Sequence, residues 1–491
     1  MRAFHAILAA MKREDVYYNA MLARDYRFDG KFFVGVKTTG IYCRPICPAK
    51  PKRENVEFFA NRLLAEKAGY RPCLRCRPEA APLSPAWMGK SAIVNRALKM
   101  IHNNDTIELD ENRFADMFGV SARHLRRVFI EEIGKTPKQI AIENRLNLSR
   151  KLVVETSLPM SDIALAAGFQ SIRRFNDAFR ERFERTPSEL RRRSATSSQA
   201  LVLSVPYRPP FDFPRLLDFY RRHANGKLEE FTEDAYIRHL KMGTNEGLLR
   251  VSNNSDRNAL QVEIEFPDIR AIHSLISRVR RMFDLDSDPL LIANSFEAAP
   301  ELARLLKKYP GLRIPSGWDP FETAIATVLG QLVTVEFGRE LVADLIEAYG
   351  QPFTSNCSLK AFPTPEVLAK SSLSKIRTTG RRKETIREIS RLIASGELSL
   401  ESTQNIEDFR KQLLSIKGVG RWTADYMTLK VLGHADSFPA TDLILARALE
   451  IHKPETIDLI SPWRGYGAAL LWCEYASRLG KKPGKNLRAE N

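Results

Sequence analysis

The amino-acid sequence predicts a multidomain protein that is mainly α-helical. Its 491 residues are enough for three or four domains. Apolar residues recur at helical spacing over residues 91–193 and 300–479, whereas the alternation typical of strands occurs in 200–205, 248–252 and 260–266. Four of the six cysteines lie between Cys43 and Cys76, which indicates a small separate domain built around them.

Composition shifts along the chain predict where the domains meet. Three prolines within residues 78–85 indicate one linker, and the small polar run 194–200 indicates another. We therefore expect four domains: small α+β over 1–84, all-α over 85–193, a small α+β sheet domain over 200–290, and all-α over 291–491.

The charge of the chain points to a polyanionic partner. The formal net charge is +17, while 44% hydrophobic and 27% charged residues are ordinary for a folded protein. Nucleic acid is therefore the first candidate, and the lack of any run of 18 apolar residues predicts no membrane partner. The apolar run from Ala3 to Met11 is short and leads directly into charged residues, so we expect no signal peptide and a cytoplasmic protein.

The cysteines have the spacing of metal ligands. Cys43 and Cys47 form a C-x3-C pair, and Cys73 and Cys76 form a C-x2-C pair. Two loops that each present two thiolates to one ion are typical of a tetrahedral zinc site, so we expect one bound Zn²⁺. Free structural cysteines are the alternative, and a disulfide is less expected in a chain without an export signal.

The residues around the quartet resemble the N-terminal domain of the bacterial adaptive-response (Ada) family over roughly residues 20–80. The resemblance is carried by the stretches 27–30, 36–45 and 53–56. It implies a domain that takes a methyl group irreversibly from a methylated DNA phosphate onto a zinc-bound cysteine. The acceptor falls on Cys43, with Cys47, Cys73 and Cys76 as the other ligands, so the zinc is both structural and nucleophile-activating.

A helix-turn-helix pattern occurs twice in the second expected domain. A helix near Phe114, a turn at Gly119 and an N-cap at Ser121 lead into a second helix, and about fifty residues later Gly168 and Ser171 repeat the device. The second helices carry basic residues, namely Arg123, Arg126 and Arg127 in the first unit and Arg173 and Arg174 in the second. One such unit alone could be an αα-hairpin with a solvated basic face, but duplication in a basic chain favours DNA binding.

The pair of units resembles the AraC-type DNA-binding domain, whose second helices enter successive major grooves. In Ada-type proteins this domain follows the zinc domain directly. The resemblance implies double-stranded promoter DNA as a partner, and we also expect RNA polymerase as a protein partner and a monomeric chain.

The second half begins with strands and ends with helices. We expect a small antiparallel sheet covered by helices near 214–223 and 269–283, without visible catalytic residues. Residues 413–424 then predict a helix-hairpin-helix with a Gly-Val-Gly turn, whose backbone N–H groups can approach a DNA phosphate without sequence preference. We expect Gly418, Gly420 and Thr423 at this DNA contact.

An aspartate some eighteen residues past the hairpin, Asp442, completes a pattern that resembles the helix-hairpin-helix DNA glycosylases. The stretches 321–333, 420–426 and 462–472 match the 3-methyladenine DNA glycosylase II (AlkA) subgroup, and the resemblance spans residues 200–480, including the sheet domain. It implies hydrolysis of the N-glycosidic bond of alkylated bases that have been flipped out of the duplex.

The resemblance assigns roles to several residues of this half. Leu332 falls on the wedge that fills the vacated base stack, with Gln331 beside it; a core leucine is the alternative. An alkylated purine is cationic, so an aromatic pocket attracts it over a normal base, and the candidate rings are Trp422, Tyr426 and Trp472; aromatic residues at such positions can also be core.

Asp442 is the expected catalytic carboxylate. Because the charged base is already a good leaving group, one ionised carboxylate can both stabilise an oxocarbenium-like sugar and position a water. Asp436 is the alternative carboxylate, and a helix N-cap is the alternative role for Asp442.

Three absent motifs restrict the chemistry. Trp422 stands where strand-cleaving relatives carry a lysine, so we expect a monofunctional glycosylase. Cys357 and Cys473 are too few for an iron–sulfur cluster, and no Pro-Cys-His-Arg motif of an O6-methylguanine transferase occurs. The expected protein joins damage sensor, transcription regulator and base-excision enzyme. The alternative is a DNA-binding regulator whose glycosylase-like half is non-catalytic.

Overall fold

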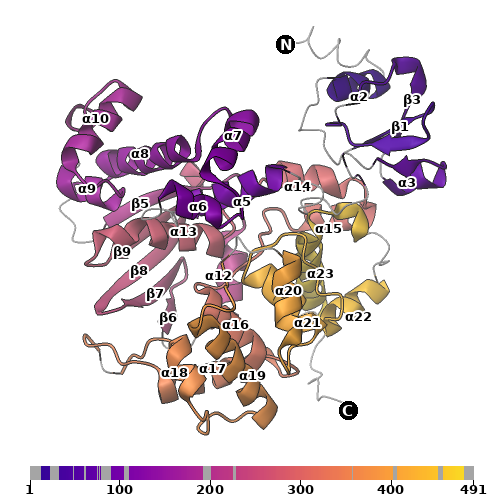
Figure 1. The fold of residues 1–491 in the computed structure, drawn as a ribbon. Coiled ribbons are helices and arrows are strands. Elements are labelled where there is room, and N and C mark those ends of the chain that lie inside the picture. The colour runs from indigo at the N-terminus through magenta and orange to yellow at the C-terminus, as the bar shows by residue number, and fades with distance from the viewer. Residues whose placement is uncertain are drawn as a thin grey trace. The chain divides into compact units, whose positions relative to one another are not determined.

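The computed structural model describes residues 13–22, 32–47, 49–59, 62–73, 76, 78, 90–103, 110–191, 201–224, 228–356, 358–401, 406–451 and 457–479. The segment 3–11, the linker 78–85 beyond Pro78 and the linker 194–200 lie outside these residues. The chain forms two compact units, residues 1–96 with 115–134, and residues 97–114 with 135–491. Figure 1 labels the helices and strands. No helix among the described residues is long and apolar enough to cross a membrane.

The first unit contains a four-stranded sheet with helices on both faces. The strand order is β3-β1-β2-β4, antiparallel except for the parallel pair β2–β4. Alternate residues of β1 enter different cores, because Val34 packs with α2 residues and Phe33 packs with Ala65 of α3. The elements are α2 (Arg13–Leu22), β1 (Phe33–Val36), β2 (Ile41–Cys43), η2 (Arg53–Asn55), β3 (Val56–Phe59), α3 (Arg62–Lys67) and β4 (Arg71–Pro72).

The two predicted helix-turn-helix motifs are confirmed down to their turns and caps. Gly119 and Gly168 have φ of +66° and +79°, which only glycine adopts without strain. Ser121 and Ser171 each accept a hydrogen bond, at 3.2 Å, from the backbone N–H three residues on. The helices of this region are α5 (Lys90–Asn103), α6 (Glu111–Asp116), α7 (Ala122–Ile133), α8 (Pro137–Glu155), α9 (Met160–Ala166), α10 (Ile172–Phe183) and α11 (Pro187–Leu190).

A five-stranded antiparallel sheet of order β5-β9-β8-β7-β6 begins the second half. Helices α12 and α13 share one core with it. The three predicted strands are present as β5, β8 and β9, but β6 and β7 were not predicted. The elements are β5 (Leu201–Pro206), α12 (Phe213–Arg222), β6 (Glu229–Phe231), β7 (Ala235–Met242), β8 (Asn245–Asn254), η4 (Ser255–Arg257), β9 (Ala259–Glu265), η5 (Ile269–Ala271) and α13 (Ile272–Met282).

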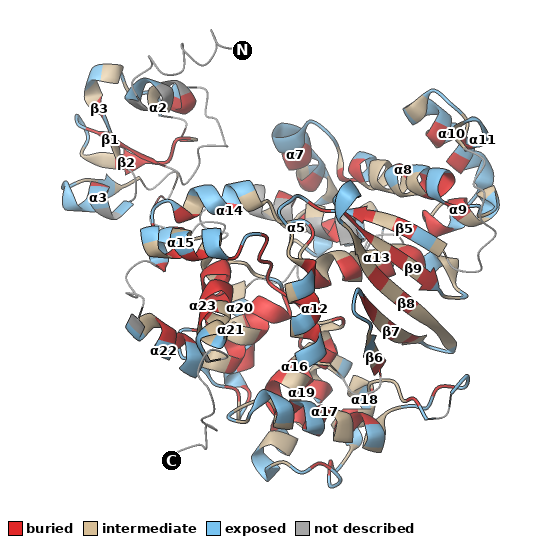
Figure 2. Ribbon diagram, turned by 180° about the vertical axis from the view of Figure 1, so that it is seen from behind, coloured by how far each residue is buried: buried red, intermediate tan, exposed pale blue. Residues whose placement is uncertain are grey.

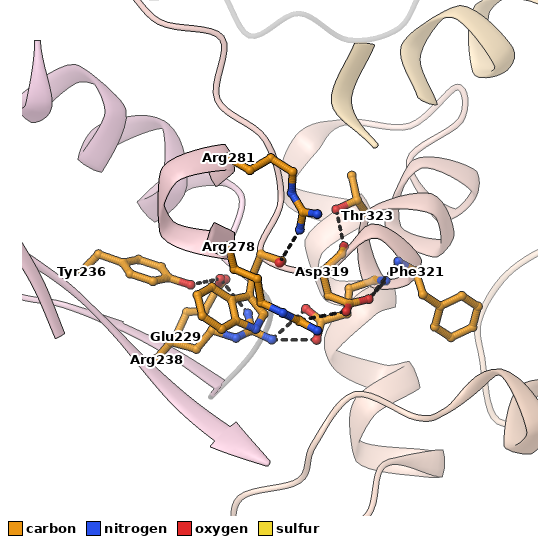
Figure 3. A network of polar contacts seen from close by, with 10 residues as sticks. Glu229, Tyr236, Arg238, Arg278, Arg281, Asp319, Phe321 and Thr323 are labelled. Carbon is orange, nitrogen blue, oxygen red and sulfur yellow. Dashed lines mark hydrogen bonds and ion pairs between the residues drawn. The ribbon is translucent and has the colours of Figure 1, made fainter. Parts of the chain in front are cut away.

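Strand β7 lacks the strand-like alternation of apolar and polar residues because one of its buried positions holds an arginine, Arg238. Arg238 donates to Glu229 Oε1 at 2.9 Å and to both carboxylate oxygens of Glu322 at 2.7 Å. Figure 3 shows Tyr236 and Arg238 reaching toward Glu229, and Arg278 reaching toward Asp319. Since Glu322 belongs to α16, this ion-pair network ties the sheet to the C-terminal helices.

The C-terminal helices surround two apolar cores. One contains much of α16, α17 and α19 with parts of α20 and α21, and the other lies among α14, α15, α22 and α23. Figure 2 shows buried residues in red along α16 and α23. The helices are α14 (Pro289–Phe296), α15 (Pro300–Lys308), α16 (Pro320–Leu329), α17 (Val335–Tyr349), α18 (Pro365–Lys370), α19 (Gly380–Ala394), α20 (Ile406–Ser415), α21 (Arg421–Lys430), α22 (Leu443–Ile451), η7 (Asp458–Ile460) and α23 (Arg464–Leu479). The fold is multidomain and mainly α, as predicted.

One edge of the large sheet is covered by α8, the helix that precedes the second helix-turn-helix motif. Strand β5 is an outer strand, so its backbone groups on one side lack a neighbouring strand. Ser204 N–H donates to Glu155 Oε2 of α8 at 2.9 Å, and Lys151 Nζ donates to the Ser204 carbonyl. Leu203 and Ile272 join the apolar core of the same unit. Polar capping and apolar burial therefore attach α8 to β5.

Candidate functional sites

The four predicted metal ligands come together in the first unit. Their Sγ atoms all lie within 4.8 Å of one another. A tetrahedral zinc site with Zn–S bonds of about 2.3 Å places its sulfurs about 3.8 Å apart, so the donor set fits one Zn²⁺. Cys43 ends strand β2, and the parallel pairing of β2 with β4 brings Cys73 beside it through the Cys73 N–H to Tyr42 carbonyl bond of 3.0 Å. No disulfide joins the described cysteines.

Arg44 supports this metal centre from within the protein. Although charged, its side chain is buried. Its backbone N–H donates to Cys76 Sγ at 3.4 Å, and its guanidinium donates to the Cys76 carbonyl at 3.2 Å. The sulfur contact places positive dipole density at a thiolate, and the carbonyl contact holds the second loop against the first. Cys43 itself is buried among the strands.

The basic residues of both recognition helices lie on the solvent side. Arg123, Arg126 and Arg127 are exposed on α7, whereas Leu125, Val128 and Phe129 of the same helix are buried. Arg173 and Arg174 are exposed at the start of α10, whose Phe175 and Phe179 are buried. Each second helix therefore buries its apolar face and presents its arginines, as a major-groove reader must.

The hairpin between α20 and α21 has the geometry of a phosphate contact. Gly418 has φ of +95°, and a Cβ on it would lie 2.1 Å from Thr385 Oγ1, so the turn requires glycine. Gly420 caps α21 without a side-chain hydrogen bond, and a Cβ there would meet open space. The first N–H groups of α21 are therefore accessible to an anion.

Thr423 lies in the interior of the hairpin. Its residue is only 2% exposed, and its hydroxyl accepts a hydrogen bond from Gln331 Nε2 at 2.9 Å. The side chain therefore braces the interior of the hairpin, and the predicted DNA contact of Thr423 rests on its backbone N–H group.

Leu332 lies in the open, which rules out the alternative that it is a core leucine. Its exposure is 101%, and its φ of +54° is in the left-handed region. That backbone costs a non-glycine residue on the order of 1–3 kcal/mol. The exposure is compatible with the predicted wedge role of Leu332. The Gln331 amide, by contrast, donates inward to the hairpin.

The three predicted aromatic residues form one cluster. Trp422 stacks on Tyr426 with ring centroids 5.1 Å apart, and Tyr426 lies 6.0 Å from Trp472 in a tilted arrangement. Trp422 and Tyr426 are one turn apart on α21, whereas Trp472 comes from α23. Burial, with a contribution from Asp442, raises the pKa of Tyr426 to about 12, so this phenol stays neutral at physiological pH.

Asp442 lies against these rings and also caps a helix. Its Oδ2 accepts from Trp422 Nε1 at 2.8 Å, and its Oδ1 accepts from Trp472 Nε1 at 3.1 Å. Oδ1 also accepts from the N–H groups of Ile444 and Leu445 at 3.0 and 2.9 Å. The N-cap role, expected as an alternative, therefore coexists with a place in the aromatic cluster.

Asp436, the alternative carboxylate, forms an ion pair with Arg464. It is buried, and Arg464 donates to its two oxygens at 3.0 and 2.9 Å. Ser461 Oγ donates to it as well, at 3.1 Å. This ion pair holds the start of α23.

Two residues that the sequence reasoning missed complete the cluster. Lys430 is buried, donates to the Pro315 carbonyl at 2.8 Å, and lies 5.0, 5.7 and 6.0 Å from the ring centroids of Phe219, Trp472 and Tyr426. Burial lowers the pKa of Lys430 to about 7. Its spacing of four from Tyr426 places both on one helix face and was a usable signal. Phe219 comes from α12 and gave none.

Comparison with known proteins agrees with these features. Three family models match: the metal binding domain of Ada over residues 16–79, a helix-turn-helix domain over 114–193, and the AlkA N-terminal domain over 202–319.

Curated relatives cover the parts and the whole. DNA-3-methyladenine glycosylase 2 of Escherichia coli is 26% identical over 55% of this chain and 96% of its own length. The bifunctional transcriptional activator/DNA repair enzyme AdaA of Bacillus subtilis is 31% identical over 37% of this chain and 83% of its own length. The "Probable bifunctional transcriptional activator/DNA repair enzyme AlkA" of Mycobacterium tuberculosis is 35% identical over 477 residues, 93% of this chain and 95% of that relative. This chain belongs to the family of bifunctional transcriptional activator/DNA repair enzymes that join Ada-type regulatory domains to an AlkA-type glycosylase.

Proposed function

We propose that the protein repairs alkylated DNA in two ways and regulates transcription in response. It releases alkylated bases of the 3-methyladenine type by hydrolysis, and it accepts methyl groups from DNA methylphosphotriesters on Cys43. The observation that carries the first activity is Asp442, a half-buried carboxylate that accepts hydrogen bonds from two indoles of an aromatic cluster beside a helix-hairpin-helix.

The division of labour follows the expected domains. We assign methyl acceptance to residues 1–84, promoter binding to 85–193, and base excision to 291–491 with the sheet domain 200–290 as its support. The ion pairs of Arg238 with Glu322 favour the last point, because they join β7 to the helix that leads to Leu332.

Base release begins with extrusion of the damaged nucleotide. Leu332 enters the vacated position, the α21 N-terminus holds the phosphate backbone, and the extruded cationic base contacts the faces of Trp422, Tyr426 or Trp472. Neutral bases gain less from the aromatic faces, which gives the site its preference for alkylated purines.

Asp442 then supports the chemical step. As the bond between C1′ and the base nitrogen breaks, positive charge develops on the sugar, and the carboxylate stabilises it. Oδ2 accepts one hydrogen bond from the described residues, so it retains capacity to orient a water, whose oxygen bonds to C1′ while its proton leaves through the carboxylate. Trp422 occupies the position just after the hairpin glycines where strand-cleaving relatives carry a lysine, so that position supplies no Schiff-base amine.

Methyl acceptance uses the chain's first unit. Cys43, Cys47, Cys73 and Cys76 would hold the Zn²⁺, which when bound would keep their thiols deprotonated. The Cys43 sulfur attacks the methyl carbon of a phosphotriester, the S–C bond forms as the C–O bond breaks, and the phosphodiester leaves as an anion. Cys47, Cys73 and Cys76 hold the fold, and the basic surface of the chain draws the phosphate backbone to it.

Methylation also alters DNA affinity. A centre of four thiolates and one Zn²⁺ carries a formal charge of 2−, which methylation of one sulfur reduces to 1−. Weaker repulsion of phosphates then strengthens promoter binding through Arg123, Arg126, Arg127, Arg173 and Arg174. We further propose that the promoter-bound protein acts as a monomer, contacts RNA polymerase, and works in the cytoplasm.

The test is base release by the full chain. Duplex DNA carrying 3-methyladenine or 7-methylguanine is incubated with wild type and Asp442→Asn, and free base is quantified. Release by the wild type that is lost in Asp442→Asn supports the proposal. No release by zinc-loaded wild type would favour the alternative, a DNA-binding regulator with a non-catalytic glycosylase-like half.

A further inference from the structure

The turn at Leu332 has a strained backbone conformation that neighbouring residues must hold in place. Leu332 adopts φ of +54° although it is not glycine, and its side chain is fully exposed. Its own side chain therefore contributes no packing that could offset the strain. The restraint must come from the peptide groups and side chains around the turn.

The amide of Gln331 supplies one part of this restraint. Its Nε2 donates to the Gly418 carbonyl at 3.2 Å and to Thr423 Oγ1 at 2.9 Å. Both acceptors belong to the helix-hairpin-helix, so the residue before the wedge is tied directly to the phosphate-contacting turn.

Arg382, on the first turn of α19, supplies the other part. Its guanidinium donates to the Gln331 carbonyl oxygen and, at 3.4 Å, to Thr378 Oγ1. The Gln331 carbonyl and the Leu332 nitrogen share one planar peptide group. A guanidinium that holds this carbonyl therefore holds the peptide plane from which the φ angle of Leu332 is measured.

Helix α19 braces the hairpin as well. Thr385, one turn after Arg382, donates from Oγ1 to the Lys417 carbonyl at 2.8 Å. The same helix thus contacts the wedge turn through Arg382 and the hairpin through Thr385. Movement of either element would break a bond to the other.

We propose that Arg382 is a positioning residue for duplex opening: it holds the Gln331–Leu332 peptide so that the wedge is set before DNA arrives. This inference rests on the proposed glycosylase function. Without Arg382 the turn relaxes toward negative φ and Leu332 no longer points where the base stack must be filled. A base that is already unpaired needs no wedge, so the loss is confined to paired lesions.

The experiment compares two substrates that differ only in pairing. One duplex carries 7-methylguanine opposite cytosine, and the other carries it as a single-nucleotide bulge. For full-length Arg382→Met we expect single-turnover release from the paired substrate to fall about tenfold or more, and release from the bulge to change less than about twofold. Arg382→Lys, which keeps a cationic donor, should recover part of the rate.

Arg391→Met is the matched control. It lies on the same helix, is exposed, and pairs with Glu388 and Glu397 away from the turn. It should leave both rates unchanged. An equal loss on both substrates by Arg382→Met, or no loss on the paired one, overturns the proposal.

A double-mutant cycle separates the wedge from other roles of Arg382. In a Leu332→Gly background the wedge is gone, so adding Arg382→Met should cost nothing further on the paired substrate. An undiminished cost would show that Arg382 acts elsewhere. Fluorescence of 2-aminopurine beside the lesion reports opening without chemistry. If wild type releases no base, the proposed function fails, while an opening signal that Arg382→Met does not reduce defeats this inference.

Discussion

The metal centre and the aromatic cluster both gather reactive groups, but they are assembled differently. The metal ligands span Cys43 to Cys76, and two short loops beside paired strands bring them together. The aromatic cluster combines Phe219 of α12, Lys430 of α21 and Trp472 of α23, which lie far apart in the chain. A metal ion imposes one geometry on nearby ligands, whereas the aromatic cluster depends on packing of whole helices.

The largest expected effect tests the local character of the metal centre. Cys73→Ser should lose zinc and unfold the first unit's small domain, because structural zinc contributes folding free energy on the order of 10 kcal/mol. Metal analysis and limited proteolysis measure this, with Cys473→Ser as the control. Base release should be undiminished, because the aromatic cluster does not depend on the metal centre. A domain that loses its metal but stays folded would contradict the prediction.

The next effect tests the chemistry of the aromatic cluster. Asp442→Asn should lower the single-turnover rate of base release by about 10²–10³-fold, because a neutral amide cannot stabilise the developing charge. DNA affinity, measured by fluorescence anisotropy, should change little, and zinc content should not change. Asp458→Asn, an exposed carboxylate, is the control. Full activity of Asp442→Asn would contradict the prediction and favour Asp436 as the catalytic carboxylate.

A smaller effect concerns the charge of the metal centre. One charge unit about 4 Å from a phosphate at an effective dielectric of about 20 contributes about 4 kcal/mol before screening. We therefore expect Cys43 methylation to raise promoter affinity by roughly one to three orders of magnitude at low salt. Gel-shift titrations before and after treatment with methylphosphotriester DNA measure the change, and Cys43→Ala should not respond. Equal dissociation constants would mean that methyl transfer serves repair alone.

The last effect tests burial in the aromatic cluster through Lys430. Its pKa is about 7 when folded, against an ordinary value of 10.5, so between these values the unfolded chain holds a proton that the folded chain lacks. Stability therefore rises with pH across this window, by at most about 1.4 kcal/mol per pH unit.

Lys430→Met should remove this pH dependence, and it should increase stability most at and below pH 7, where the cost of burying the lysine is fully present. Urea unfolding at several pH values gives the free energy of unfolding of both proteins. In the difference between the two, the contributions of the other titrating groups cancel. Lys417→Met, at an exposed lysine, should leave the slope unchanged. A parallel pH dependence in Lys430→Met would show that Lys430 is not neutral in the folded state.

Much of the architecture could be predicted because it rests on local rules. Gly119 and Gly168 mark turns that need positive φ, and Ser121 and Ser171 mark caps, so both motifs were placed correctly. Strand β7 was missed because Arg238 occupies a buried position, and only its pairing with Glu229 and Glu322 makes that position tolerable. The hydrogen bond from Gln331 to Thr423 could not be predicted, because helix periodicity does not reveal which neighbour covers a residue.

The sequence by itself determined the zinc ligands, the repeated DNA-binding motif and the helix-hairpin-helix, because each depends on residues close together in the chain. Tertiary structure decided that Leu332 is exposed on a strained turn rather than a core residue, that Asp442 rather than Asp436 adjoins the aromatic rings, and that Lys430 is buried beside them. These features depend on contacts between helices distant in sequence, whose packing no local pattern encodes.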